Sequence, residues 1–180
     1  RPTARGAGRA ARWLVRAHAA GDIAAAHQFA SDRGVAMFVL GGGSNVVVAD
    51  EGFAGCVAQV DLRGLRFSEE NGDTLVSAAA GEPWDGVVEA AVIRGLSGLE
   101  CLSGIPGSVG GTPIQNVGAY GQEVADTIDR VGVYDRERSV TAVLTAADCE
   151  FAYRASRFKG RDAGRFVVCE VISSLRRGAP

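Results

Sequence analysis

The sequence predicts an α+β protein with mixed sheets and flanking helices. Three observations support this fold class. The chain opens with a strand, a helix and a second strand; its centre contains short runs of alternating apolar residues; and one further segment has helical periodicity. Apolar residues make up 47% of the 180 residues, which is ample for a packed core in one large domain or two small ones. We therefore expect a folded chain rather than a disordered one.

The opening of the chain has a βαβ-like pattern. Residues 13–17 predict a strand, and Asp22 stands at the expected N-cap of a helix that Gly34 ends. Within that helix, apolar residues recur at helical spacing at Ile23, Ala26 and Ala30. Residues 36–40 are wholly apolar and bounded by glycines, which predicts a buried strand.

The centre of the chain is rich in predicted strands. Apolar runs at residues 46–49 and 56–62 are followed by two strands, 65–67 and 74–80, that flank a polar turn at 69–73. The last pair therefore predicts a hairpin.

A second helix begins at Pro83, which we place at the first helical position, and Gly95 closes it. Its apolar face consists of Trp84, Val87, Val88, Ala91 and Val92. Further strands are predicted at residues 131–134, 140–144 and 166–172, with a turn of helix at 146–149.

Charge and cysteine usage exclude several classes of partner. The net charge of −2 gives no support to a nucleic-acid-binding or polybasic membrane surface. The four cysteines form no CxxC pair, and His18 and His27 have no metal-ligand pattern, so free thiols and no metal site are expected. No apolar run is long enough to span a membrane, and no secretion signal is present at the start. We expect a soluble, cytoplasmic protein; its oligomeric state is left open.

The 25 glycines are clustered rather than periodic. The first cluster, here called the glycine turn, follows an apolar strand and consists of Gly41, Gly42, Gly43, Ser44 and Asn45. Successive N–H groups in such a turn can form a concave anion site. The pattern is neither a dinucleotide fingerprint nor a P-loop, because an apolar run follows at once and the only lysine, Lys159, is distant. Taken alone, this cluster supports a phosphate site and a plain turn equally.

The second cluster lies between Gly95 and Gly121, where glycines are too frequent for regular helix or strand. We call residues 104–121 the strip. It combines rigid prolines, glycines that allow close approach, and polar side chains, so it can wrap a large planar ligand. The candidate binding residues are Ile105, Pro106, Gly107, Ser108, Gly110, Gly111, Thr112, Gln115, Asn116, Gly118, Ala119 and Tyr120.

A third segment, residues 151–159, is called here the Tyr-Arg segment. By itself it indicates only a solvated, mildly basic turn. Together with the other motifs, it resembles the UDP-N-acetylenolpyruvoylglucosamine reductases (UDP-N-acetylmuramate dehydrogenases). The strip is similar to their flavin-binding loop, the glycine turn to their pyrophosphate-binding loop, and the Tyr-Arg segment to their Tyr-Arg-x-Ser-x-Phe-Lys stretch. Residues 81–84 also match, and the likeness extends over residues 13–176.

The resemblance implies an FAD-binding fold of the vanillyl-alcohol oxidase type with two subdomains, expected at residues 1–62 and 63–180. It implies that the glycine turn holds the FAD pyrophosphate and that the strip lines the ribityl chain and the isoalloxazine. NADPH is the implied hydride donor. The implied substrate is a nucleotide sugar, whose enolpyruvyl group receives the hydride to give UDP-N-acetylmuramate for peptidoglycan synthesis.

The resemblance also assigns roles in the Tyr-Arg segment. Arg154 is the expected catalytic residue, because a permanently charged guanidinium can clamp the enolpyruvyl carboxylate as negative charge develops there. Tyr153 is expected to contact substrate, with a packing role nearly as well supported. Ser156 and Lys159 are expected to face solvent. We assign no cofactor role before Trp13.

The family has a third, C-terminal domain that carries its proton-donor serine, and neither occurs in this sequence. We therefore expect a truncated form of a full reductase. The alternative is a stand-alone, non-catalytic FAD-binding module.

Overall fold

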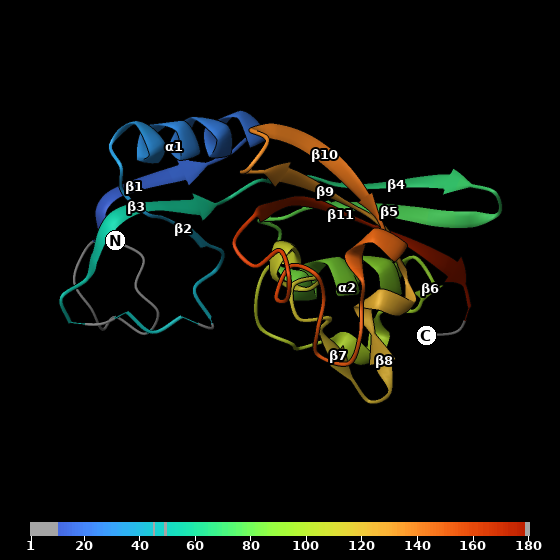
Figure 1. Ribbon diagram of the computed structural model, residues 1–180. Helices are drawn as coiled ribbons and strands as arrows, with labels where there is room; N and C mark the ends of the chain where they lie inside the picture. The colour runs from blue at the N-terminus through green and yellow to red at the C-terminus, as the bar shows by residue number, and fades with distance from the viewer. Residues whose placement is uncertain (1–10, 45, 49, 179–180) are drawn as a thin grey trace.

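The computed structural model describes residues 11–44, 46–48 and 50–178, which form two main sheets, their helices and one two-stranded hairpin (Figure 1). One sheet is small and is built from the first part of the chain; the other is larger and contains the later strands. The predicted α+β class is confirmed, with one parallel and one antiparallel sheet. The division into subdomains at residues 62 and 63 stays a prediction.

The small sheet consists of three parallel strands in the order β1 (Ala11–Ala17), β3 (Phe53–Val60) and β2 (Met37–Leu40). Parallel neighbours need a crossover, and α1 (Ala20–Asp32) supplies the one between β1 and β2. Figure 1 shows α1 lying along β1. The buried residues of α1 are the predicted core residues Ile23, Ala26 and Ala30.

The start of α1 differs from the prediction. The helix begins at Ala20, so Asp22 lies in its first turn and not at the N-cap. Its carboxylate accepts the backbone N–H of His18 at 2.8 Å and that of Ala19 at 3.0 Å, which lowers the pKa of Asp22. Asp22 therefore stabilises the N-terminal end of α1 from a position in its first turn. Gly34 follows the helix with φ of +62°, as a C-terminal glycine does.

The large sheet has six strands. β10 (Val140–Thr145), β9 (Ile128–Asp135), β11 (Phe166–Arg177), β5 (Asp73–Ala79) and β4 (Leu65–Glu70) follow one another in that spatial order, and all neighbours are antiparallel. β6 (Leu96–Ser97) pairs with the far end of β11. The predicted hairpin is β4 and β5, joined at Asn71 and Gly72, both with positive φ.

The second helix, α2 (Trp84–Ile93), begins one position later than predicted, so Pro83 is its N-cap and not its first helical residue. It buries the predicted apolar residues Trp84, Val87, Val88 and Ala91. In Figure 1, α2 lies beneath the large sheet, close to β5 and β11.

The glycine-rich region after α2 is an ordered loop, as predicted, but it contains short elements. These are 3-10 turns at Glu100–Leu102 and Val109–Gly111, and a small hairpin of β7 (Gly118–Ala119) and β8 (Gln122–Glu123). Two more 3-10 turns occur at Val124–Asp126 and Ala147–Cys149. Residues 46–49 were expected to form a strand. Residues 46–48 belong to no strand, and Val47 is fully exposed. Ala49 lies outside the described residues.

Among the described residues, no helix is both long and apolar enough to cross a membrane. All four cysteines are free. Burial raises the pKa of the Cys149 thiol, and that of Cys169, to about 11, so both thiols stay protonated at neutral pH.

Candidate functional site

The glycine turn and the strip meet across one pocket, although residues 46–103 separate them in the sequence. A Cβ atom placed on Gly41 would lie 3.0 Å from the Ser108 hydroxyl, and one on Gly107 would lie 3.6 Å from that of Ser44. The cavity between them has a volume of about 370 Å³. Its lining residues are Gly41, Gly42, Gly43, Ser44, Val46, Trp84, Ile105, Pro106, Gly107, Ser108, Gly111, Thr112, Ile114, Gln115, Val117 and Lys159.

The strip is held in place by the segment that leads into α2. The Trp84 N–H donates to the Gly107 carbonyl at 3.1 Å, and the Val109 N–H donates to that of Glu82 at 2.9 Å. The Trp84 indole N–H donates to the Leu102 carbonyl at 3.0 Å, so this buried ring forms part of the pocket wall in a fixed orientation.

Gly110 serves this attachment rather than the pocket. Its N–H donates to the Ala80 carbonyl at 2.9 Å, and a Cβ placed on it would lie only 2.7 Å from the Ala80 Cβ. No larger residue fits here without movement of the backbone. Gly110 was predicted to touch the cofactor, but it is not among the residues that line the cavity.

The first residues of the strip are fixed by Asp85 of α2. Its carboxylate accepts the Gly104 N–H at 2.7 Å and the Ser103 hydroxyl at 2.9 Å. These two bonds lower the pKa of Asp85, the Gly104 N–H having the larger effect.

Residues on both sides of the cavity have backbone N–H groups that are unused in the described part of the chain. Within the described part of the chain, no hydrogen bond uses the N–H groups of Gly42, Gly43 or Ser44, nor those of Gly107 or Ser108. A Cβ on Gly42 would meet nothing within 4 Å, so the space above this backbone is open. Unused N–H groups around an open concave surface suit an anion such as a diphosphate. The residues present therefore fit the phosphate part of the cofactor implied by the sequence.

Several predicted binding residues lie outside the pocket. Asn116 is buried: its amide N–H groups donate to Glu123 Oε2 at 2.6 Å and to the Ala152 carbonyl at 3.1 Å, and its carbonyl oxygen accepts the Ala125 N–H. The side chain therefore holds the strip to the Tyr-Arg segment.

The other predicted residues outside the cavity belong to the hairpin of β7 and β8. Gly118 and Ala119 form β7, and Tyr120 stands at the turn with 93% of its surface exposed. Asn45, also predicted to bind, lies outside the described residues.

The Tyr-Arg segment is attached to the strip, and one expectation about it is wrong. Ser156 is buried, and its hydroxyl donates to the Ile114 carbonyl at 2.6 Å, so it does not face solvent. Lys159 is exposed, as expected, and it also lines the cavity.

Arg154 and Tyr153 are exposed and do not line this cavity. Arg154 has φ of +51° and is held in a tight turn by reciprocal hydrogen bonds between Ala152 and Ala155. Its guanidinium lies 5.6 Å from the centroid of the Tyr153 ring. Within the described part of the chain, no carboxylate forms an ion pair with Arg154.

Sequence reasoning missed some of the wall. Val46, Ile114 and Val117 are apolar residues within or beside polar motifs, and Trp84 was assigned only to the core face of α2. The signal for Ile114 and Val117 was their position inside the strip itself. An apolar wall around backbone donors is typical of small-molecule pockets.

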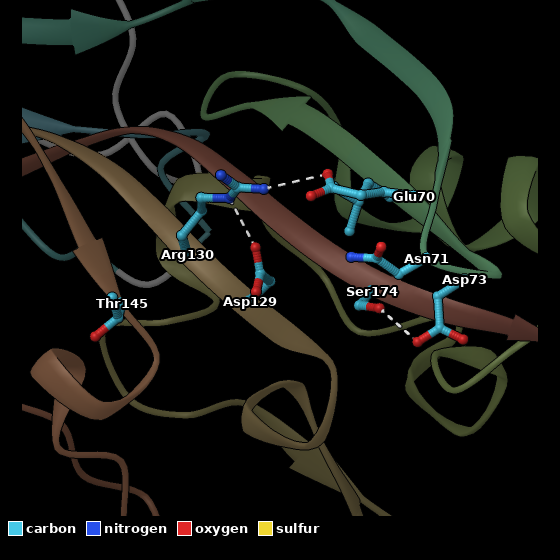
Figure 2. Close-up of a pocket in the computed structure, with 8 residues that line it drawn as sticks. Glu70, Asn71, Asp73, Asp129, Arg130, Thr145 and Ser174 are labelled. Carbon is cyan, nitrogen blue, oxygen red and sulfur yellow. Dashed lines mark hydrogen bonds and ion pairs between the residues drawn. The ribbon is translucent and has the colours of Figure 1, made fainter.

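A second cavity of about 370 Å³ lies at one end of the large sheet (Figure 2). Its charged groups are already paired: Arg130 lies 2.7 Å from Asp129 and 3.6 Å from Glu70, and the Ser174 hydroxyl donates to Asp73. None of the residues predicted to bind a ligand contributes to it. We therefore take the glycine-turn pocket as the candidate site.

Comparison with known proteins identifies the family of the chain. The family described as "FAD binding domain" matches residues 11–142. UDP-N-acetylenolpyruvoylglucosamine reductase of Thermobifida fusca is 59% identical over 143 residues, which is 78% of this chain and 39% of that protein. The protein of the same name from Salinispora arenicola is 54% identical over 91% of this chain and 45% of its own length. The chain thus spans less than half the length of these relatives.

Solved structures give the same result for the fold. The UDP-N-acetylenolpyruvylglucosamine reductase of Thermus caldophilus matches with a TM-score of 0.72 and 27% identity over 93% of this chain and 56% of that one. A solvent-stable cholesterol oxidase matches at 15% identity with a TM-score of 0.65 over 91% of this chain and 34% of that one, which shows a shared fold alone. The predicted FAD-binding fold of the vanillyl-alcohol oxidase type is therefore confirmed. The chain belongs to the FAD binding domain family and is similar to the FAD-binding part of the UDP-N-acetylenolpyruvoylglucosamine reductases.

Proposed function

We propose that the chain holds FAD in the glycine-turn pocket as part of an NADPH-dependent, cytoplasmic reductase that converts UDP-N-acetylenolpyruvoylglucosamine to UDP-N-acetylmuramate. One observation carries the proposal. Two distant glycine clusters enclose a single cavity with unused N–H groups, in a chain that is up to 59% identical to proteins of that name.

Different lining residues are proposed to contact different parts of FAD. The N–H groups of Gly42, Gly43 and Ser44 are the proposed donors to the FAD pyrophosphate, with Gly107 and Ser108 opposite them. Trp84, together with the apolar residues of the strip, supplies a wall that excludes water. When bound, FAD supplies hydride transfer between NADPH and the enolpyruvyl group, while the protein supplies position and electrostatics.

Arg154 is the proposed catalytic residue, and Tyr153 the proposed substrate contact beside it. With no carboxylate partner among the described residues, the Arg154 guanidinium is available to a ligand anion. Such a group can hold the substrate carboxylate through two hydrogen bonds and stabilise the negative charge that develops during reduction. The strained left-handed backbone at Arg154 is consistent with a residue held in place for function.

The test is titration of the purified chain with FAD, followed by anaerobic addition of NADPH while the flavin absorbance is recorded. We expect one FAD per chain and loss of the oxidised flavin spectrum on addition of NADPH. Absence of FAD binding would contradict the proposal as a whole. FAD binding without reduction by NADPH would favour the stand-alone FAD-binding module instead.

A further inference from the structure

Lys159 is the only lysine in the chain, and it lines the pocket proposed for FAD. Every other described residue that lines this cavity is uncharged. Its ammonium group is therefore the one full charge among the described lining residues. The proposed contacts between the glycine turn and the pyrophosphate use backbone N–H groups and need no cation. The Lys159 ammonium group must therefore have another role.

The backbone of Lys159 is fixed at one end of the strip. The Ser156 hydroxyl donates to the Ile114 carbonyl at 2.6 Å, and the N–H groups of Lys159 and Gly160 both donate to the Ser156 carbonyl. Phe158 is buried with its ring edge-on to Phe166. The segment that carries Lys159 is therefore attached to the strip at Ile114, whereas the glycine turn meets the strip at Gly107 and Ser108.

The ammonium group has free hydrogen-bonding capacity. Lys159 Nζ donates to the Arg154 carbonyl at 3.3 Å, which uses one of its three N–H groups. Within the described part of the chain, no carboxylate forms an ion pair with it. The charge is thus available to a negatively charged group bound in the cavity.

We propose that Lys159 is the cationic partner of the redox-active ring of FAD and stabilises the reduced ring relative to the oxidised one. This rests on the proposed function, in which the pocket holds FAD. Reduction by NADPH transfers two electrons and one proton as a hydride: NADPH becomes NADP⁺, and the ring gains a negative charge. A cation beside the ring favours that charged state.

The charge of the pyrophosphate is the same in both redox states. A lysine placed against the pyrophosphate would strengthen the binding of oxidised and reduced FAD equally. A lysine placed against the ring strengthens the binding of reduced FAD more. The reduction potential of bound FAD therefore distinguishes the two positions.

The experiment compares that potential in the wild-type chain and in Lys159→Met, Lys159→Arg and Arg161→Met, by equilibration with a reference dye. Arg161 is the matched control, because it carries a nearby positive charge but does not line the cavity. We expect Lys159→Met to weaken the binding of reduced FAD about tenfold more than the binding of oxidised FAD. This corresponds to a fall of about 30 mV in the reduction potential of a two-electron couple. Lys159→Arg should have a reduction potential close to that of the wild-type chain, and Arg161→Met should change the potential little.

A second readout uses the chemistry of a single lysine. An amine-specific acetylating reagent can modify only the Lys159 amine and the chain's α-amine, so mass spectrometry reports each separately. We expect FAD to protect Lys159 and not the α-amine. Lack of protection, an unchanged potential in Lys159→Met, or an equal shift in Arg161→Met would each overturn the proposal. Failure of the wild-type chain to bind FAD would overturn the proposed function as well. The role of Lys159 alone is overturned when the wild-type chain binds FAD but one of these three results is obtained.

Discussion

The Ser156 hydroxyl donates a 2.6 Å hydrogen bond to the Ile114 carbonyl, and this contact joins the Tyr-Arg segment to the strip. Asn116 makes a second connection through the Ala152 carbonyl. The residues proposed to act on the substrate and those proposed to hold FAD are therefore parts of one hydrogen-bonded unit.

Ser156→Ala should weaken FAD binding several-fold while the fold is retained. The substitution removes one hydrogen bond, for a loss of about 1 kcal/mol, and water can reach the exposed Ile114. The loss should appear as a higher dissociation constant for FAD in a fluorescence titration. Ser68→Ala, on the exposed edge strand β4, is the control and should leave the affinity unchanged; an equal effect of both variants would contradict the connection.

Gly42→Ala should weaken FAD binding strongly without loss of stability. A Cβ at this position meets nothing within 4 Å in the protein, so the fold accommodates it, but it would occupy the space that the pyrophosphate is proposed to fill. Thermal unfolding without FAD and titration with FAD separate these effects. The matched control is Gly86→Ala in α2, which also has open space; it should stabilise the chain by about 1 kcal/mol and leave FAD affinity intact.

Gly110→Ala and its neighbour Gly111→Ala should have opposite consequences. The Cβ of the first would stand 2.7 Å from that of Ala80, so we expect destabilisation of about 1–3 kcal/mol in chemical unfolding. The second meets nothing within 4 Å and lines the cavity, so its effect should fall on FAD affinity. A destabilised Gly111→Ala with normal affinity would show that the strip is oriented differently.

Arg154→Ala should slow hydride transfer to substrate by about 10²–10³-fold, because one preorganised donor to the developing charge is lost. A full-length reductase that contains this chain is reduced and mixed with UDP-N-acetylenolpyruvoylglucosamine, and the return of the oxidised flavin absorbance gives the rate. Reduction of the flavin by NADPH should be unchanged. Arg16→Ala, an exposed arginine of β1, is the control, and near-normal reoxidation in Arg154→Ala would remove the residue from the proposed mechanism.

The sequence predicted most elements of this fold because their signals are local. The apolar spacing of α2 and the polar turn of the β4–β5 hairpin depend only on neighbouring residues. The burial of Ser156 and the place of Lys159 at the cavity could not be predicted in this way, because both depend on the strip, which is distant in sequence and which Ser156 contacts at Ile114. The packing role of Gly110 could not be predicted either, because a glycine that packs against Ala80 cannot be distinguished in sequence from one that approaches a ligand. Asn116 was likewise predicted to bind, because its contacts with Glu123 and the Ala152 carbonyl are not visible in the sequence.

Stability should fall in acid because of Asp135 at the end of β9. Its buried carboxylate accepts hydrogen bonds from Arg165 at 2.7 and 3.1 Å and from the Glu137 and Arg138 N–H groups, and the Arg165 bonds are the main cause of its lowered pKa. Because the folded pKa lies below the unfolded one, the stabilisation is fully present above the unfolded pKa, near 3.9, and is lost as the pH falls through the folded pKa. Urea unfolding at a series of pH values measures this loss.

Asp135→Asn should be less stable at pH 7 because Arg165 loses the most buried of its three carboxylate partners. It should also show a smaller decrease in unfolding free energy below pH 4, because the titrating group is gone. Asp129→Asn is the control on the same strand: its pair with Arg130 is solvent-exposed, so its removal should cost no more than about 1 kcal/mol. Since Asp135 and Arg165 join the end of β9 to the start of β11, a wild-type acid profile in Asp135→Asn would mean that other carboxylates determine the acid sensitivity of the large sheet.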